Sequence, residues 1–215
     1  MAEIINLDKP KKPLLSRLKS ISALIFDWDG VFNSGYKGID HASGYFEPDI
    51  LGLNMLRFSF WLKTNSILPV VIISGAENPN SKALSQREHF NFLLNGVFNK
   101  GKSLDVLSEL HGLDIRNAAL FFDDLNDLSM LPKCGVTSMI GRDASSASQK
   151  IIHAKYKLDY ISNFESGGYA LREIFERMLE DLDMLENIID HRSELSDAYL
   201  DYMKDREKIK LKVIV

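Results

Sequence analysis

The chain has 215 residues, of which 45% are hydrophobic and 26% are charged, a composition typical of a soluble globular protein with one domain. Its formal net charge of −4 counts against a general nucleic-acid binder, and its only cysteine, Cys134, excludes an internal disulfide and favours a reducing compartment. Because no apolar run approaches the roughly 20 residues of a membrane span and no signal peptide is recognisable, we expect a cytoplasmic protein without nucleic-acid or membrane partners.

Apolar runs alternate with amphipathic ones along the chain, which predicts an α/β fold with a Rossmann-like, doubly wound and mostly parallel sheet. Strands are expected at 22–27, 68–74, 92–98, 118–122 and 135–140, with a weaker one near 157–161. Helices are expected at about 50–64, 80–90, 102–111, 125–131, 144–151 and 168–190. The final residues 208–215 alternate in the manner of a strand.

Two segments lie outside this alternation. Residues 31–48 are polar and aromatic with three interspersed glycines, which predicts a short β-hairpin inserted after the first strand. From Leu171 onward, apolar residues recur at helical spacing and predict a long C-terminal helix over 168–190, with Met203 as the limit of any continuation. This helix either closes the domain or presents part of its apolar stripe to a partner subunit.

The first predicted strand ends in two carboxylates, Asp27 and Asp29, with Trp28 between them and Gly30 after them. The period of two in a strand puts both carboxylates on one side, and the glycine lets the backbone turn away. Such a pair suits a hard divalent cation such as Mg²⁺, but solvated aspartates in an ordinary Asp-Gly turn are an equal alternative. An EF-hand is excluded, because the twelfth residue counted from Asp27 is Gly38 rather than a glutamate.

Other polar residues follow the later strands, at the sheet edge where open α/β sheets bind ligands. Ser74 and Gly75 follow the second strand and suit phosphate oxygens, although most Ser-Gly pairs are simple turns. Lys100 and Lys102 begin a helix, where lysine opposes the helix dipole, and they either bind an anion or are solvated. Three carboxylates follow the end of the fourth strand, those of Asp123, Asp124 and Asp127. A helix cap accounts for only one of them. The four segments jointly favour a site for phosphate and metal.

Together the four segments resemble the motifs of the haloacid dehalogenase (HAD) superfamily of aspartate-nucleophile phosphohydrolases, over about residues 22–180. In chain order the matching segments are Asp27–Val31, Ser74 with Gly75, Lys100, and Asp123 with Asp127. The short insertion and residues 167–173 are similar to the capless branch, which includes the 3-deoxy-D-manno-octulosonate 8-phosphate phosphatases. The resemblance implies a phosphatase domain over residues 1–190 and a helical and extended tail over residues 191–215.

The resemblance also implies a role for each matching residue. Asp27 is expected to attack phosphorus, and Asp29 is expected to act as general acid and then as general base. Mg²⁺ is expected to be held by Asp27, Asp29 (through its backbone carbonyl) and Asp123. The residues expected to bind phosphate are Ser74, Gly75 and Lys100, and those expected to support the metal's waters or the lysine are Asn126 and Asp127.

The implied function is Mg²⁺-dependent hydrolysis of a small phosphorylated metabolite, such as a sugar-acid phosphate, through an aspartyl-phosphate, by a homo-oligomer for which the branch favours a tetramer. Ala76 follows the second motif where the branch usually has an arginine, which leaves the sugar-acid substrate open. The alternative is a catalytically idle HAD-fold assembly or regulatory protein that binds partners through its C-terminal helix. The histidines show no metal-ligand spacing, although His41 in the predicted hairpin could approach a substrate across a subunit boundary.

Overall fold

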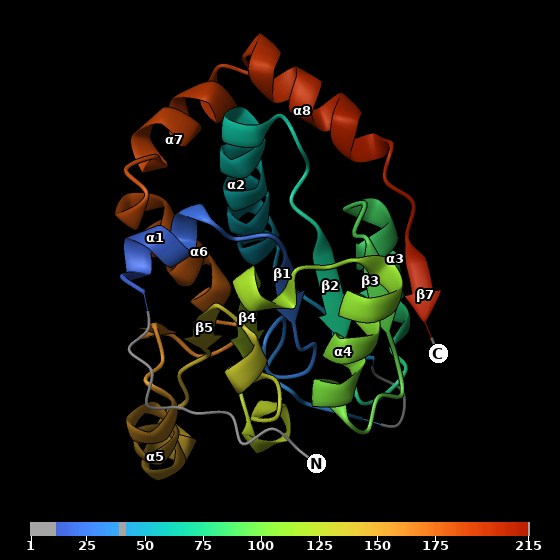
Figure 1. Cartoon of the computed structure of the whole chain (residues 1–215), viewed down its shortest axis with the longest axis vertical. Helices are drawn as coiled ribbons and strands as arrows, with labels where there is room; N and C mark the ends of the chain where they lie inside the picture. The colour runs from blue at the N-terminus through green and yellow to red at the C-terminus, as the bar shows by residue number, and fades with distance from the viewer. Residues whose placement is uncertain (1–11, 39–41, 215) are drawn as a thin grey trace.

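The computed structural model describes residues 12–38 and 42–214, and within them a wholly parallel, seven-stranded sheet lies between layers of helices (Figure 1). The strands are β1 (Leu24–Phe26), β2 (Val70–Ile73), β3 (Phe92–Leu94), β4 (Ala119–Phe122), β5 (Val136–Met139), β6 (Tyr160–Ile161) and β7 (Lys212–Ile214). Their order across the sheet is β6-β5-β4-β1-β2-β3-β7. The order therefore reverses at β1, which pairs with both β2 and β4, and such a reversal is where doubly wound sheets bind ligands.

The predicted doubly wound parallel sheet is confirmed. Each of the first six strands lies within its predicted range, and the alternating residues at the end of the chain form β7, which runs parallel to β3. The helices are α1 (Leu14–Lys19), α2 (Glu47–Thr64), α3 (Pro79–Arg87), α4 (Lys100–His111), α5 (Ser146–Tyr156), α6 (Ala170–Asp181), α7 (Leu185–Ser193) and α8 (Asp197–Glu207). No helix in the described part of the chain is both long and apolar enough to cross a membrane.

Alternate strand residues supply the two hydrophobic layers of the core. Leu24 and Phe26 of β1 belong to the layer that also contains residues of α2 and α6. Ile25 points to the opposite layer, which contains Leu104 and Leu107 of α4. A parallel sheet covered on both faces requires strands that are apolar throughout, and β1 is fully buried over its whole length.

The prediction of one long C-terminal helix is wrong, because the structure has three helices there. Asp183 (φ 56°) and Leu195 (φ 49°) adopt left-handed backbone conformations at the two breaks. The turns let Ile188 of α7 and Tyr202 of α8 bury themselves in the same layer as α2. A straight helix would carry these side chains away from the domain.

Two other predicted elements differ from the structure. Residues 125–131 were expected to be α-helical but contain the 3₁₀ turn Leu125–Asp127, followed by a second at Leu131–Lys133. The backbone bonds there join residues three apart, as from the Leu128 amide to the Leu125 carbonyl at 3.3 Å, which is the 3₁₀ pattern. The hairpin predicted over 31–48 stays a prediction, since residues 39–41, and with them His41, lie outside the described residues. Within the described part of this loop, residues 29 and 33 form an isolated bridge.

Candidate active site

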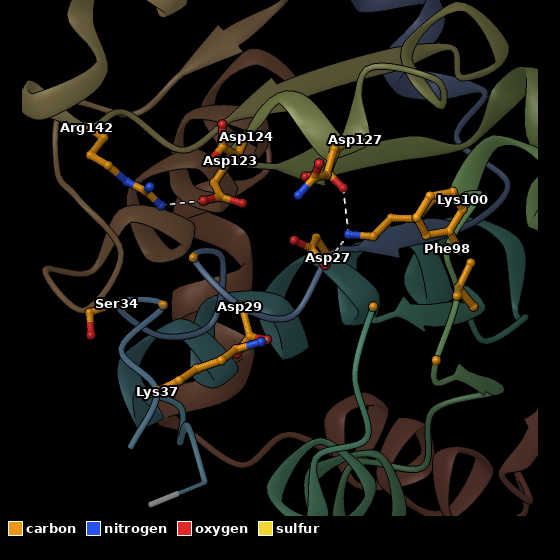
Figure 2. Close-up of a pocket in the computed structure, with 16 residues that line it drawn as sticks. Asp27, Asp29, Ser34, Lys37, Phe98, Lys100, Asp123, Asp124, Asp127 and Arg142 are labelled. Atoms are coloured by element: carbon orange, nitrogen blue, oxygen red, sulfur yellow. Dashed lines mark hydrogen bonds and ion pairs between the residues drawn. The ribbon is translucent and has the colours of Figure 1, made fainter. Parts of the chain in front are cut away.

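The site forms where the carboxyl ends of the central strands meet. Asp27 follows β1 and Asp123 follows the adjacent β4, and the Asp27 amide donates a hydrogen bond to the Phe121 carbonyl at 3.0 Å. A cleft of about 610 Å³ opens at this edge of the sheet (Figure 2). The predicted site residues that line it are Asp27, Asp29, Gly75, Lys100, Asp123, Asn126 and Asp127. Most of the predicted set, drawn from four segments far apart in sequence, is therefore brought together.

Lys100 lies at the centre of the cleft, between two carboxylates. Its Nζ atom donates to Asp27 Oδ1 at 2.5 Å and to Asp127 Oδ1 at 2.6 Å (Figure 2). All three residues are buried. Lys102, the alternative lysine from the sequence, is exposed to solvent. The geometry therefore favours Lys100 over Lys102 as the lysine of the site.

Three buried carboxylates surround this lysine. Asp27, Asp123 and Asp127 each have an oxygen within 4.8 Å of the others'. Within the described residues, the buried Oδ2 atom of Asp127 has no hydrogen-bond partner. Oxygen ligands packed this closely, one of them unsatisfied, fit a hard divalent cation. Gly30 (φ 82°) leaves the space for this arrangement, because a Cβ atom there would lie 2.0 Å from Asp123 Oδ2.

The electrostatics of the cleft lead to the same conclusion. Burial, together with the nearby Asp127 carboxylate, raises the pKa of Asp27 to about 6, and burial together with Asp27 raises the pKa of Asp123 to about 7. Burial alone would lower the pKa of Lys100, but Asp27 and Asp127 outweigh it, so the pKa of Lys100 is raised. The carboxylates are thus only partly neutralised by protein groups. A bound divalent cation would relieve the remaining repulsion.

The Asp29 carboxylate faces a different part of the cleft from the three buried carboxylates. Its Oδ1 atom accepts from Ser43 Oγ at 2.6 Å, and its Oδ2 atom lies 2.9 Å from Lys37 Nζ. Ser43 Oγ in turn accepts from Trp28 Nε1 at 3.2 Å and from Asn78 Nδ2 at 2.7 Å. The fully buried Trp28 therefore helps to orient Asp29 through Ser43.

Of the two residues predicted to bind phosphate, Ser74 and Gly75, the structure brings only one to the cleft. The Ser74 hydroxyl donates to the Ala76 carbonyl at 2.8 Å and accepts from the Ala76 amide at 3.3 Å, so it closes its own turn. Ser74 is buried and does not line the cleft, whereas Gly75 does. Asn126 lines the cleft with an exposed side chain.

Sequence reasoning missed several cleft residues, and three of them have prominent side chains. Arg142 forms an ion pair with Asp123, Lys37 pairs with Asp29, and the side chain of Phe98 is fully exposed beside the cleft (Figure 2). Arg142 follows β5 directly after Ile140 and Gly141, so a basic residue at the end of a fifth strand was the available signal. Lys37 belongs to the inserted loop, and nothing in its local sequence points to the site.

No family model matches the chain, but solved structures share its fold. The fold is that of the HAD superfamily hydrolases. A Legionella pneumophila protein named as a HAD superfamily (subfamily III A) hydrolase is 23% identical, with a TM-score of 0.68 over 87% of this chain and 94% of that one. The resemblance predicted from the sequence motifs is thereby confirmed.

Within that class, the structure is similar to 3-deoxy-D-manno-octulosonate 8-phosphate phosphatases. The enzyme from Moraxella catarrhalis, solved with magnesium, phosphate and a KDO molecule, is 21% identical, with a TM-score of 0.66 over 82% of this chain and 95% of that one. A probable YrbI family phosphatase from Pseudomonas syringae is 26% identical, with a TM-score of 0.67 over 85% and 97% of the two chains.

Proposed function

We propose that this protein is a Mg²⁺-dependent phosphatase that hydrolyses a small phosphorylated metabolite through an aspartyl-phosphate. One observation carries the proposal: the Lys100 ammonium spans Asp27 and Asp127 at 2.5 and 2.6 Å, with Asp123 in the same buried cluster. A buried lysine beside a strand-end carboxylate provides both a nucleophile and a charge for the transferring oxygens. The likeness to named phosphatases supports the same reading.

Asp27 is the proposed nucleophile, because its carboxylate faces the cleft and is held by Lys100. Attack of Asp27 on phosphorus breaks the bond to the leaving oxygen and forms an acyl phosphate, which water then hydrolyses. Lys100 and the Gly75 amide are the proposed donors to the phosphoryl oxygens. Ser74 belongs to this set only if its hydroxyl leaves the turn with Ala76.

Asp29 is the proposed general acid and base. It lines the cleft, and Ser43 and Lys37 hold its two carboxylate oxygens, which fixes its orientation. In the first step it would give a proton to the leaving oxygen, and in the second it would take a proton from the attacking water. Lys37 is exposed, so the carboxylate remains accessible to solvent protons.

The residues that would hold Mg²⁺ are Asp27, Asp123 and the backbone carbonyl of Asp29. When bound, the cation would supply positive charge against the repulsion between carboxylate and phosphate. Asp127 would hold Lys100 in place, as its 2.6 Å bond suggests, and Asn126 would act beside it. These assignments account for the raised pKa values of Asp27 and Asp123.

The proposed substrate is a sugar-acid or other sugar phosphate, and the proposed assembly is a cytoplasmic homo-oligomer, with a tetramer favoured. The KDO molecule bound by the Moraxella catarrhalis enzyme supports the substrate class. A polar cleft of about 610 Å³ is large enough for a phosphorylated sugar.

The test is hydrolysis of p-nitrophenyl phosphate with Mg²⁺ or with a chelator. The parent protein should release p-nitrophenol only with Mg²⁺, and Asp27→Asn should lose the activity while keeping its circular dichroism spectrum. Asp201→Asn is the matched control, because Asp201 is exposed on α8 and pairs only with Lys204 in the described contacts. Equal rates for Asp27→Asn and the parent would contradict the nucleophile assignment. Absence of release across a broad set of phosphate esters would favour the idle, partner-binding alternative.

A further inference from the structure

Arg142 is held in place by its backbone. Its carbonyl accepts a hydrogen bond from Gln149 Nε2 at 3.1 Å, and the amide of the next residue, Asp143, donates to Glu165 Oε1 at 2.9 Å. Both bonds hold the peptide unit after the Cα atom of Arg142, and on the preceding side the Gly141 amide donates to Ser162 Oγ at 2.8 Å. The side chain that it presents to the cleft is 30% exposed.

The guanidinium of Arg142 is aimed at one of the proposed metal ligands. Its Nη2 atom donates to Asp123 Oδ2 (Figure 2). Gly30 makes room for both partners, because a Cβ atom there would lie 2.0 Å from that oxygen and 2.8 Å from Arg142 Nη2. The pair therefore occupies a space that the backbone leaves open for it.

We infer that Arg142 competes with the divalent cation for Asp123, so that cation binding releases the guanidinium into the cleft, where it binds an oxyanion of the substrate. This inference rests on the proposed function, since it takes Asp123 as a metal ligand. A carboxylate oxygen that accepts from a guanidinium has less charge to offer a metal, and the guanidinium also repels a cation placed beside it. Arg142 therefore lowers the affinity of the site for the cation.

The release gives Arg142 a second role. Asp123 is its only ion-pair partner in the described contacts, so a cation that takes Asp123 leaves a planar fork of donors facing the cleft. Such a fork matches the oxygens of a phosphate or carboxylate. The two equilibria are coupled, and linkage requires that the cation strengthen substrate binding. By the same linkage, bound substrate strengthens cation binding.

The experiment measures Mg²⁺ binding to the metal-free full-length chain by isothermal titration calorimetry, without substrate. Arg142→Gln removes the guanidinium and keeps a polar side chain of similar length. Arg87→Gln is the matched control, because Arg87 lies on α3 away from the cleft and the change removes the same charge from ion pairs with Glu47 and Glu88. Arg142→Gln should bind Mg²⁺ about tenfold more tightly than the parent, and Arg87→Gln should bind it equally. The KM for p-nitrophenyl phosphate at saturating Mg²⁺ should rise severalfold in Arg142→Gln alone.

All outcomes except a complete lack of Mg²⁺ binding separate this inference from the proposed function. Equal or weaker Mg²⁺ binding by Arg142→Gln, in a parent that hydrolyses phosphate esters, would overturn the competition and leave the phosphatase standing. Tighter binding with an unchanged KM would overturn the release to substrate. Tighter binding in a protein that hydrolyses nothing would support the competition and count against the phosphatase. If neither protein binds Mg²⁺, both proposals are overturned.

Discussion

Replacing Lys100 with methionine tests the charge balance of the cleft. Methionine keeps most of the apolar stem but removes the ammonium that lies 2.5 Å from Asp27 Oδ1 and 2.6 Å from Asp127 Oδ1. The two carboxylates are then buried beside each other and beside Asp123 without the cation that separates them. The folded state of the variant should therefore be less stable than the parent, and the loss should depend on pH.

The structure sets the size of the effect. Removing one partner of a buried ion pair costs about 3–5 kcal/mol. A proton can take the place of the ammonium, however, because the pKa of Asp27 is already raised to about 6 and Lys100 is one of the groups that lowers it. Protonating a group whose pKa lies one unit below the pH costs about 1.4 kcal/mol. At pH 7, protonation of Asp27 therefore limits the loss of stability. We expect a loss of about 3 kcal/mol at pH 8 and about 1 kcal/mol at pH 5.5.

The sign follows from proton binding. In the variant, the folded pKa of Asp27 lies above its ordinary value, so the folded state binds more protons than the unfolded state and gains stability as the pH falls. Urea denaturation in the presence of a chelator, at pH 8 and pH 5.5, measures the change. Lys102→Met is the matched control, since Lys102 is exposed on the same helix and should change stability by less than about 0.5 kcal/mol. A loss in Lys100→Met equal to that of the control, or one that grows toward low pH, would refute the reasoning.

Three other predictions concern the acid, the metal site and the C-terminal helix. Asp29→Asn should lower kcat by about 10²–10⁴ with an alkyl phosphate and far less with p-nitrophenyl phosphate, whose leaving group needs no proton; steady-state rates on both substrates check this. The metal-free parent should lose stability as the pH rises from 5 to 8, because the folded pKa values of Asp27 (about 6) and Asp123 (about 7) exceed their ordinary value of 3.8. Saturating Mg²⁺ should remove that loss. Urea denaturation midpoints with chelator or with Mg²⁺ measure both effects. Arg206→Met should cost about 2 kcal/mol, because Arg206 Nη1 lies 3.0 Å from the buried Glu88 carboxylate, and hydrogen exchange should increase in α8 but not in β1.

The sheet could be predicted because its strands are continuous apolar runs, and the site could be predicted because polar residues stop those runs. Asp27 and Asp123 are such residues, and a parallel sheet brings all its carboxyl ends to one edge. Their mutual distances depend on strand order, which local sequence does not contain.

The features that sequence did not show depend on tertiary contacts. The break at Leu195 requires left-handed backbone at a residue with no preference for it, whereas Asp183 is of a type that tolerates it. Both breaks arise because α7 and α8 pack back onto α2. Arg142 has a role only because β5 lies beside β4 and brings it to Asp123. Ser74 was expected to face phosphate, but a competing bond to Ala76 within its own turn was not foreseen.

The two outermost strands of the sheet affect how readily the protein aggregates. A sheet margin exposes backbone donors and acceptors that can recruit a second chain into an intermolecular aggregate. Here β6 has two residues and β7 has three, and exposed Lys210 and Lys212 add charge along the latter. By pairing with β3, the short lysine-flanked β7 covers a buried apolar strand that would otherwise be the margin. The last strand therefore protects the folded protein against aggregation through this margin of the sheet.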